Sequence, residues 1–121
     1  MSIGSIESSC DCGAVRLRMA RAPEEVTDCN CSLCRRYGAL WAYYAPRDVQ
    51  VGSGETDIYT RGPRHIEFHR CKHCGCITHW SAIDRSREHM GVNARLMEPE
   101  VLQQARLRHL DGAGSWKYLD E

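Results

Sequence analysis

The chain has 121 residues, a length that suits one compact domain, and we expect residues 1–121 to form a single domain. Its 16 Lys and Arg residues balance its 16 Asp and Glu residues, so the formal net charge is zero. This balance gives no electrostatic argument for nucleic acid or an anionic membrane surface, and we expect neither as a partner. The eight cysteines stand out, because the rest of the apolar core is thin for this length.

The N-terminal stretch MSIGSIESSCDCG has neither the basic region nor the apolar region of a signal peptide. No apolar run approaches the roughly 20 residues that are needed to span a bilayer. We therefore expect a soluble, cytoplasmic protein. Structural disulfides are rare in the cytosol, so clustered cysteines there are more often metal ligands or catalytic groups.

Alternation of apolar and polar residues predicts a mostly β chain. In AVRLRMA (14–20), the first predicted strand, Val15, Leu17 and Met19 share one face. Further strands are expected at LWAYYA (40–45), within VQVGSGETDIYTRG (49–62) on either side of a glycine turn, at RHIEFHRC (64–71), at CITHWSAI (76–83), at RLRHL (106–110) and at WKYL (116–119). Only EPEVLQQAR (98–106) predicts a helix, with Pro99 placed in its first turn.

Two cysteine pairs, CDCG (10–13) and CKHCG (71–75), are each followed directly by a glycine. Glycine permits the tight turn and the close backbone approach that a metal-binding knuckle needs. Zinc favours four tetrahedral ligands, and thiolate is among its best donors. The two pairs therefore predict one structural zinc site that clips the N-terminal strand to the middle of the chain; its ligands are Cys10, Cys12, Cys71 and Cys74.

The stretch CNCSLC (29–34) offers three more thiols from one tight loop, and Cys76 is left over. A catalytic zinc typically has three protein ligands and keeps its fourth position for water or substrate. Two alternatives stay open: Cys76 closes the second site, or some of these cysteines are buried free thiols. If the segment is extended, Cys74 and Cys76 leave it on the same face, so we predict that Cys76 lies near the first site. Thiolates suit iron as well as zinc, and the spacing does not choose between them.

The motifs CDCGAV, CNCSLCRRYGAL and CKHCGC, in this order, resemble the glutathione-dependent formaldehyde-activating enzyme family, as do RLMEPE and the terminal SWKYL. The resemblance implies a Mss4-like β-tent fold, made of small antiparallel sheets and one short helix and stapled by zinc. It implies two Zn²⁺ per chain. The structural zinc falls on Cys10, Cys12, Cys71 and Cys74, and the catalytic zinc on Cys29, Cys31 and Cys34. Where the family commonly carries Thr or Ser, this chain has Cys76.

The reaction for which the family is named joins formaldehyde and glutathione into S-hydroxymethylglutathione, and its reverse breaks a carbon–sulfur bond. The resemblance therefore implies a zinc-dependent lyase of thiol–aldehyde chemistry, with a glutathione-like thiol and an aldehyde as small-molecule partners. The alternative is a non-catalytic zinc-binding module that docks a protein partner. Exchange of a small thiol ligand at the second metal would separate the two.

Arg35 and Arg36 follow the cysteine triplet, and a guanidinium can fork onto a substrate carboxylate. The alternative is that they pair with an acid or with loop carbonyls. Nearby aromatic side chains can line a pocket or fill the core: Tyr37, Trp41, Tyr43 and Tyr44. We expect Gly38 to close the turn after the triplet, and the six histidines to be structural rather than ligands or proton shuttles.

Overall fold

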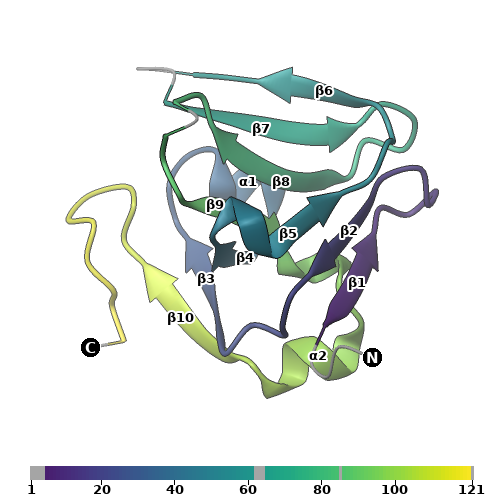
Figure 1. Cartoon of the computed structure of the whole chain (residues 1–121). Helices are drawn as coiled ribbons and strands as arrows, with labels where there is room; N and C mark the ends of the chain where they lie inside the picture. The colour runs from purple at the N-terminus through teal and green to yellow at the C-terminus, as the bar shows by residue number, and fades with distance from the viewer. Residues whose placement is uncertain (1–4, 62–64, 85, 121) are drawn as a thin grey trace.

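Two β-sheets and two short α-helices make up the fold in the computed structural model, which describes residues 5–61, 65–84 and 86–120 (Figure 1). The strands are β1 (Ile6–Ser9), β2 (Arg16–Met19), β3 (Glu25–Cys29), β4 (Trp41–Tyr44), β5 (Val49–Val51), β6 (Thr56–Tyr59), β7 (Ile66–Cys71), β8 (Ile77–Ala82), β9 (Met90–Asn93) and β10 (Arg106–Leu110), and the helices are α1 (Cys34–Tyr37) and α2 (Pro99–Gln104). The smaller sheet has the order β1-β2-β5, and the larger has the order β10-β3-β4-β9-β8-β7-β6.

The predicted mostly β fold is confirmed, with differences in detail. A second helix, α1, is present, and it is a single turn of four residues, too short to leave a periodic pattern in the sequence. Strand β10 pairs with β3 in parallel, although the other pairs are antiparallel, because the chain passes through α2 before it returns to the sheet edge. WKYL (116–119) does not form a strand, and only an isolated bridge joins Leu110 to Tyr118.

The larger sheet carries apolar side chains on both faces, as its inner strand β4 shows. Ala42 and Tyr44 pack in the core between the two sheets, together with Leu17 of β2. Trp41 points to the opposite face, where it packs against Phe68 of β7 with ring centroids 6.1 Å apart. Since successive side chains of a strand alternate between faces, one strand can serve two separate apolar clusters. Within the described ranges, no helix is long and apolar enough to cross a membrane.

A pair of stacked histidines lies on β7 and β8. His69 and His79 face each other across the strands, with ring centroids 4.2 Å apart and planes 7° from parallel. The His69 ring shares hydrogen bonds with the hydroxyls of Thr56 (3.1 Å) and Ser81 (2.9 Å). Burial, and then the nearby charge of His69, lower the pKa of His79 to about 3. The His79 ring is therefore neutral at pH 7, and it has a structural role in the sheet.

We predict that acid weakens the fold through His79. The unfolded chain binds a proton there near pH 6.5, whereas the folded chain does so only near pH 3. Between these values the unfolded state holds more protons, so stability falls as the pH falls, by about 1.4 kcal/mol per pH unit. Urea unfolding should show wild type losing about 2 kcal/mol more than His79→Gln between pH 7 and pH 5. An equal loss in both proteins, at constant metal content, would contradict the prediction.

Candidate metal centres

The first cysteine cluster joins two hairpin turns that belong to different sheets. Cys10 and Cys12 lie in the turn after β1, while Cys71 ends β7 and Cys74 lies in the turn that follows, and the two turns are adjacent (Figure 1). Their four sulfur atoms all lie within 4.8 Å of one another. The Cys12 sulfur is 3.7 Å from that of Cys10 and 3.6 Å from that of Cys71. A zinc–sulfur bond of about 2.3 Å gives tetrahedral edges of roughly 3.8 Å, so the cluster fits a tetrahedral ion.

The glycine after each knuckle adopts the conformation that the sequence predicts. Gly13 and Gly75 both have φ of +80°, in the left-handed region that other residues rarely adopt. The Gly13 N–H donates to the Cys10 carbonyl at 3.1 Å, and the Gly75 N–H donates to the Cys71 carbonyl at 3.0 Å. Each glycine therefore turns the backbone around its pair of sulfurs.

Backbone amides also donate to the sulfur atoms of this cluster. The Val15 N–H lies 3.3 Å from the Cys10 sulfur, and the His73 N–H lies 3.4 Å from the Cys71 sulfur. Amides of Cys12 and Cys76 lower the pKa of the Cys74 thiol to about 6. Donors to sulfur stabilise thiolate, the form that binds a metal, so these amides prepare Cys10, Cys71 and Cys74 as ligands.

The second cluster is the buried triplet of Cys29, Cys31 and Cys34, whose sulfur atoms also lie within 4.8 Å of one another. Cys29 ends β3 and Cys34 begins α1, so one short loop supplies all three thiols. The Cys34 N–H donates to the Cys31 sulfur at 3.3 Å, and the Trp41 indole N–H donates to the Cys34 sulfur at the same distance. The Cys34 thiol, aided by the Cys31 amide, lowers the pKa of Cys29 to about 6. Gly38 ends α1 in the left-handed conformation at φ +67°, as expected.

Among residues 5–61, 65–84 and 86–120, no fourth His, Cys, Asp or Glu ligand atom joins the triplet. Cys76 lies beside the first cluster instead. There the Asp11 amide lowers the pKa of its thiol, but burial and the sulfurs of Cys74 and Cys10 raise it overall. The position of Cys76 beside the first cluster agrees with the sequence-based prediction. The prediction assumed an extended backbone between Cys74 and Cys76, and the structure has a turn there instead. Gly75 turns the chain, and the Cys71 N–H donates to the Cys76 carbonyl at 2.9 Å to close the hairpin.

The triplet opens onto a cavity of about 160 Å³. Aromatic and aliphatic side chains form most of its wall: Trp41, Tyr43, Ile66, Phe68, Trp80 and Leu110. Of the four aromatic residues that the sequence singles out, Trp41 and Tyr43 line the cavity. Tyr44 faces the core between the sheets, and Tyr37 packs on Phe68 with ring centroids 5.8 Å apart. Strand alternation decides which aromatic residue goes where.

Arg61 is the one charged side chain among the described residues that line this cavity. It donates to the Ser32 hydroxyl at 2.7 Å and to the Cys31 sulfur at 3.5 Å. Neither Arg35 nor Arg36 lines the cavity, and Arg36 instead donates to the Ser32 carbonyl at 2.7 Å. The sequence analysis missed Arg61 because it stands 30 residues beyond Cys31 and belongs to no motif. From the sequence, the position of Arg61 at the end of a predicted strand indicated only that this residue lies in a loop.

A C-terminal loop, residues 111–117, closes the cavity on another side and places Trp116 in its lining. Asn30, which stands between two cysteines of the triplet, anchors this loop. Its side-chain amide donates to the Asp111 carboxylate at 3.0 Å and accepts from the Ala113 N–H at 2.9 Å. The first residue of the loop after Asp111 is Gly112, where a Cβ atom would overlap the Cys29 sulfur. The sequence predicted a strand at WKYL (116–119), which overlaps the end of this loop, and no motif connected the loop to the site.

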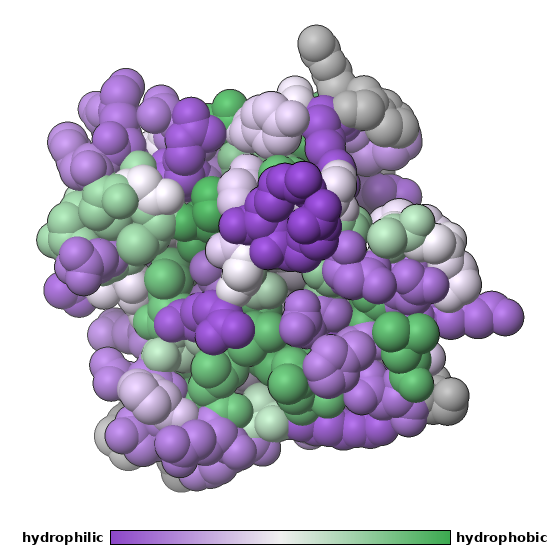
Figure 2. Space-filling model, turned by 180° about the vertical axis from the view of Figure 1, so that it is seen from behind, coloured by the Kyte–Doolittle hydropathy of each residue, from purple (hydrophilic) through white to green (hydrophobic). Residues whose placement is uncertain are grey.

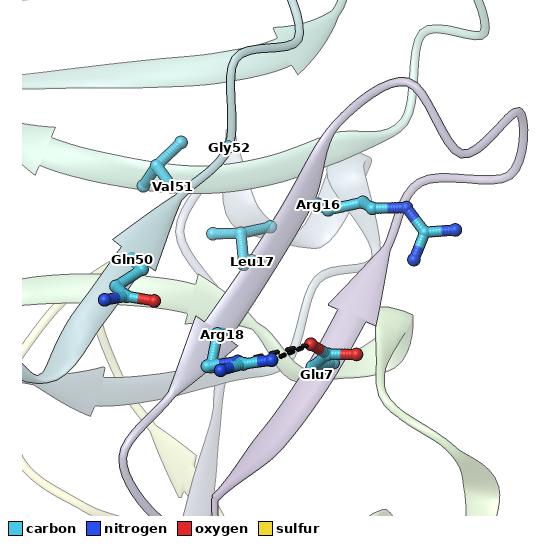
Figure 3. A pocket seen from close by; sticks show the side chains of 7 residues that line it. All are labelled: Glu7, Arg16, Leu17, Arg18, Gln50, Val51 and Gly52. Atoms are coloured by element: carbon cyan, nitrogen blue, oxygen red, sulfur yellow. Dashed lines mark hydrogen bonds and ion pairs between the residues drawn. The ribbon is translucent and has the colours of Figure 1, made fainter.

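A larger hollow, of about 530 Å³, lies on the smaller sheet (Figure 3). Side chains of β1, β2 and β5 line it, and Arg18 pairs there with Glu7 at 2.6 Å. Both members of the pair are exposed, so the pair contributes little to stability. No cysteine lies in the lining of this hollow, which makes the smaller cavity at the triplet the better candidate for chemistry.

Together, the fold and the two clusters define a small, mostly β protein with two cysteine sites that can hold metal ions. The chain belongs to the glutathione-dependent formaldehyde-activating enzyme family, whose sequence profile matches residues 5–109. A crystal structure of a Rhodobacter sphaeroides protein, a structural genomics target, is similar at 30% sequence identity and a TM-score of 0.68. That match covers 84% of this chain and 99% of the other. The comparison with curated proteins found no match.

Because a Cβ atom at position 112 would overlap the Cys29 sulfur, we predict that a side chain there disturbs the triplet. Gly112→Ala should push the loop or Cys29 out of place, at a cost of about 1–3 kcal/mol, and should weaken metal binding at the triplet. Competition with a chelator should release one metal per chain more readily than in wild type, while the other stays bound. Gly114→Ala is the matched control in the same loop, because the atoms nearest to a Cβ there belong to the Asp111 carboxylate, at 3.1 Å or more, and not to a cysteine. Equal metal retention in both variants would contradict the prediction.

Proposed function

We propose that this protein is a zinc-dependent enzyme that makes or breaks the carbon–sulfur bond of a thiol–aldehyde adduct, as S-(hydroxymethyl)glutathione synthase does. In this proposal, Cys29, Cys31 and Cys34 hold a catalytic zinc, and the first cluster holds a structural zinc. The observation that carries it is a buried thiol triplet that faces a cavity and has no fourth ligand residue in the described ranges. Its eight unpaired cysteines suit a reducing compartment, so we place the enzyme in the cytoplasm.

The proposed reaction balances without an oxidant or a reductant. The thiol sulfur attacks the carbonyl carbon of the aldehyde, one carbon–sulfur bond forms, and the thiol proton ends on the former carbonyl oxygen. The lyase direction reverses these changes. A zinc held by Cys29, Cys31 and Cys34 would lower the pKa of the substrate thiol, and the three thiolates would leave the site with a formal charge of −1, which would favour thiol exchange over activation of water.

The cavity supports this chemistry through its own residues. Its apolar walls, which include Phe68 and Trp80, exclude water from a nucleophile that water would otherwise solvate. The Trp41 indole N–H fixes the Cys34 sulfur, and the Arg61 guanidinium sets a positive charge beside Cys31. Burial raises the pKa of Tyr43, so its hydroxyl stays protonated in the neutral range.

The alternative function, a non-catalytic zinc-binding module that docks a protein partner, has less support from the distribution of apolar residues on the surface. On the face that includes α1, apolar residues lie in patches that hydrophilic side chains divide (Figure 2). Large exposed apolar side chains come from several elements, among them Val51 of β5, Ile58 and Tyr59 of β6, Leu107 of β10, and Trp116 and Leu119 of the C-terminal segment. A docking surface is typically one contiguous apolar patch, whereas the cavity at the triplet is a built concave site.

The two clusters should respond differently to loss of one ligand. Cys71→Ser removes a ligand that joins two sheets, and a structural zinc contributes roughly 10 kcal/mol or more to folding in small domains, so this variant should not fold. Cys31→Ser breaks a site made by one loop, so it should stay folded, retain one zinc and lose catalysis. Circular dichroism, elemental analysis and turnover of S-hydroxymethylglutathione measure the three outcomes.

Wild-type protein should hold two zinc ions per chain in the same analysis, and a thiol should bind only when both are present. Calorimetry with glutathione and with smaller thiols tests this point on the zinc-loaded protein. If no thiol binds to protein with two zincs, the enzyme proposal fails and the docking module becomes preferable. Unfolding of Cys31→Ser to the same extent as Cys71→Ser would make the triplet a second structural site.

A further inference from the structure

We propose that the triplet cavity selects a small thiol with a single carboxylate on a short apolar body. In this proposal, Arg61 binds the carboxylate and Trp116 covers the body. The inference rests on the proposed function, since it names which thiol the site takes. It moves the substrate clamp from Arg35 and Arg36, which lie outside the cavity lining, to Arg61, which lies within it.

The size and polarity of the cavity argue against enclosing a tripeptide. Its volume of about 160 Å³ is smaller than the roughly 300–1,000 Å³ of pockets that enclose drug-sized ligands. Glutathione carries two carboxylates, an ammonium group and two peptide groups. Apolar walls cannot supply hydrogen bonds to all of these groups, and a buried polar group without a partner is costly. A compact thiol with few polar groups suits the space.

Among the described residues that line the cavity, Arg61 is the one cation, and one cation matches one carboxylate on the ligand. A guanidinium has five N–H donors, and the two hydrogen bonds of Arg61 within the described residues go to a hydroxyl and a thiol, neither of which is a carboxylate. Its contact with Cys31, at 3.5 Å, puts the charge next to the sulfur atoms. A thiol held at the triplet can therefore present a carboxylate to Arg61 only if a short chain separates its sulfur from that group.

Trp116 supplies the apolar contact at the opening of the cavity. Its side chain is 69% exposed, and its φ of +60° is uncommon for a bulky residue and costs of order 1–3 kcal/mol. The loop holds it there, because the Trp116 N–H donates to the Asp111 carbonyl at 2.8 Å. A ligand body that covers the indole would remove apolar area from water.

The test compares three thiols on the zinc-loaded protein by titration calorimetry. They are 3-mercaptopropionate, its neutral analogue 3-mercapto-1-propanol, and glutathione. A charge-assisted hydrogen bond predicts that 3-mercaptopropionate binds about tenfold or more tightly than the neutral analogue. We also expect it to bind more tightly than glutathione. This comparison needs no variant, so it does not depend on whether any substituted protein folds.

Variants then test whether Arg61 binds the carboxylate and whether Trp116 covers the apolar body. Arg61→Gln should remove the preference for 3-mercaptopropionate over the neutral thiol, while Arg61→Lys should restore part of this preference because Lys keeps the charge but lacks the fork. Arg47→Gln is the control, since that arginine is exposed and pairs with Glu88 at 3.1 Å. Trp116→Ala should weaken both small thiols about equally, and Leu119→Ala, an exposed apolar residue of the same segment, should weaken neither.

The outcomes separate the two proposals. If no thiol binds, the proposed function fails. If thiols bind but the charged and neutral analogues bind equally to wild type, or if glutathione binds more tightly than 3-mercaptopropionate, the proposed function stands and this inference is overturned. An unchanged preference in Arg61→Gln, with both zincs present, would also overturn the assignment of the carboxylate to Arg61.

Discussion

Four sulfur atoms at the tips of two hairpins set the constraint on which the rest of the structure depends. The smaller sheet has only three strands, each of three or four residues. So few short strands are marginally stable alone, and they need packing against another layer. The sulfur cluster brings the β1–β2 turn to the β7–β8 turn, and Cys10 and Cys71 are themselves part of the buried core between the sheets. A metal there would act on the region where the two layers meet.

That arrangement places the two cysteine clusters on opposite faces of the larger sheet. One face of the larger sheet packs on the smaller sheet, and the other face carries the triplet and its cavity. Strand β4 serves both, with Ala42 toward the core and Trp41 toward the triplet. The indole N–H of Trp41 then bonds Cys34, so the packed sheet directly positions a thiol of the candidate site.

The walls of the cavity come from parts of the chain that differ in how firmly they are held. Trp41, Phe68 and Trp80 stand on strands of the larger sheet, which fixes their positions. Arg61 and Trp116 stand on connecting segments, and each is tied to the triplet loop, through Ser32 and Asn30 respectively. A rigid apolar floor with loop residues at its rim is a common arrangement for selective sites, because loops can change without disturbing the scaffold.

The sequence by itself determined the features that depend on neighbours a few residues apart. These are the alternating strands, the helix that begins at Pro99, and the left-handed glycines at 13 and 75 that follow each knuckle. It also separated the cysteines into a group of four and a group of three, because ligand spacing within a turn is a local property.

Only the tertiary structure decided which distant groups share the cavity. Arg61 approaches Cys31 across 30 residues of chain, and the loop with Trp116 meets Asn30 across more than 80. No local pattern encodes such contacts, since they depend on the order of strands in the sheet and on the parallel return of β10 beside β3. The sequence placed Arg35 and Arg36 next to the triplet, but the short helix α1 turns them to solvent, and the fold brings a different arginine to the site.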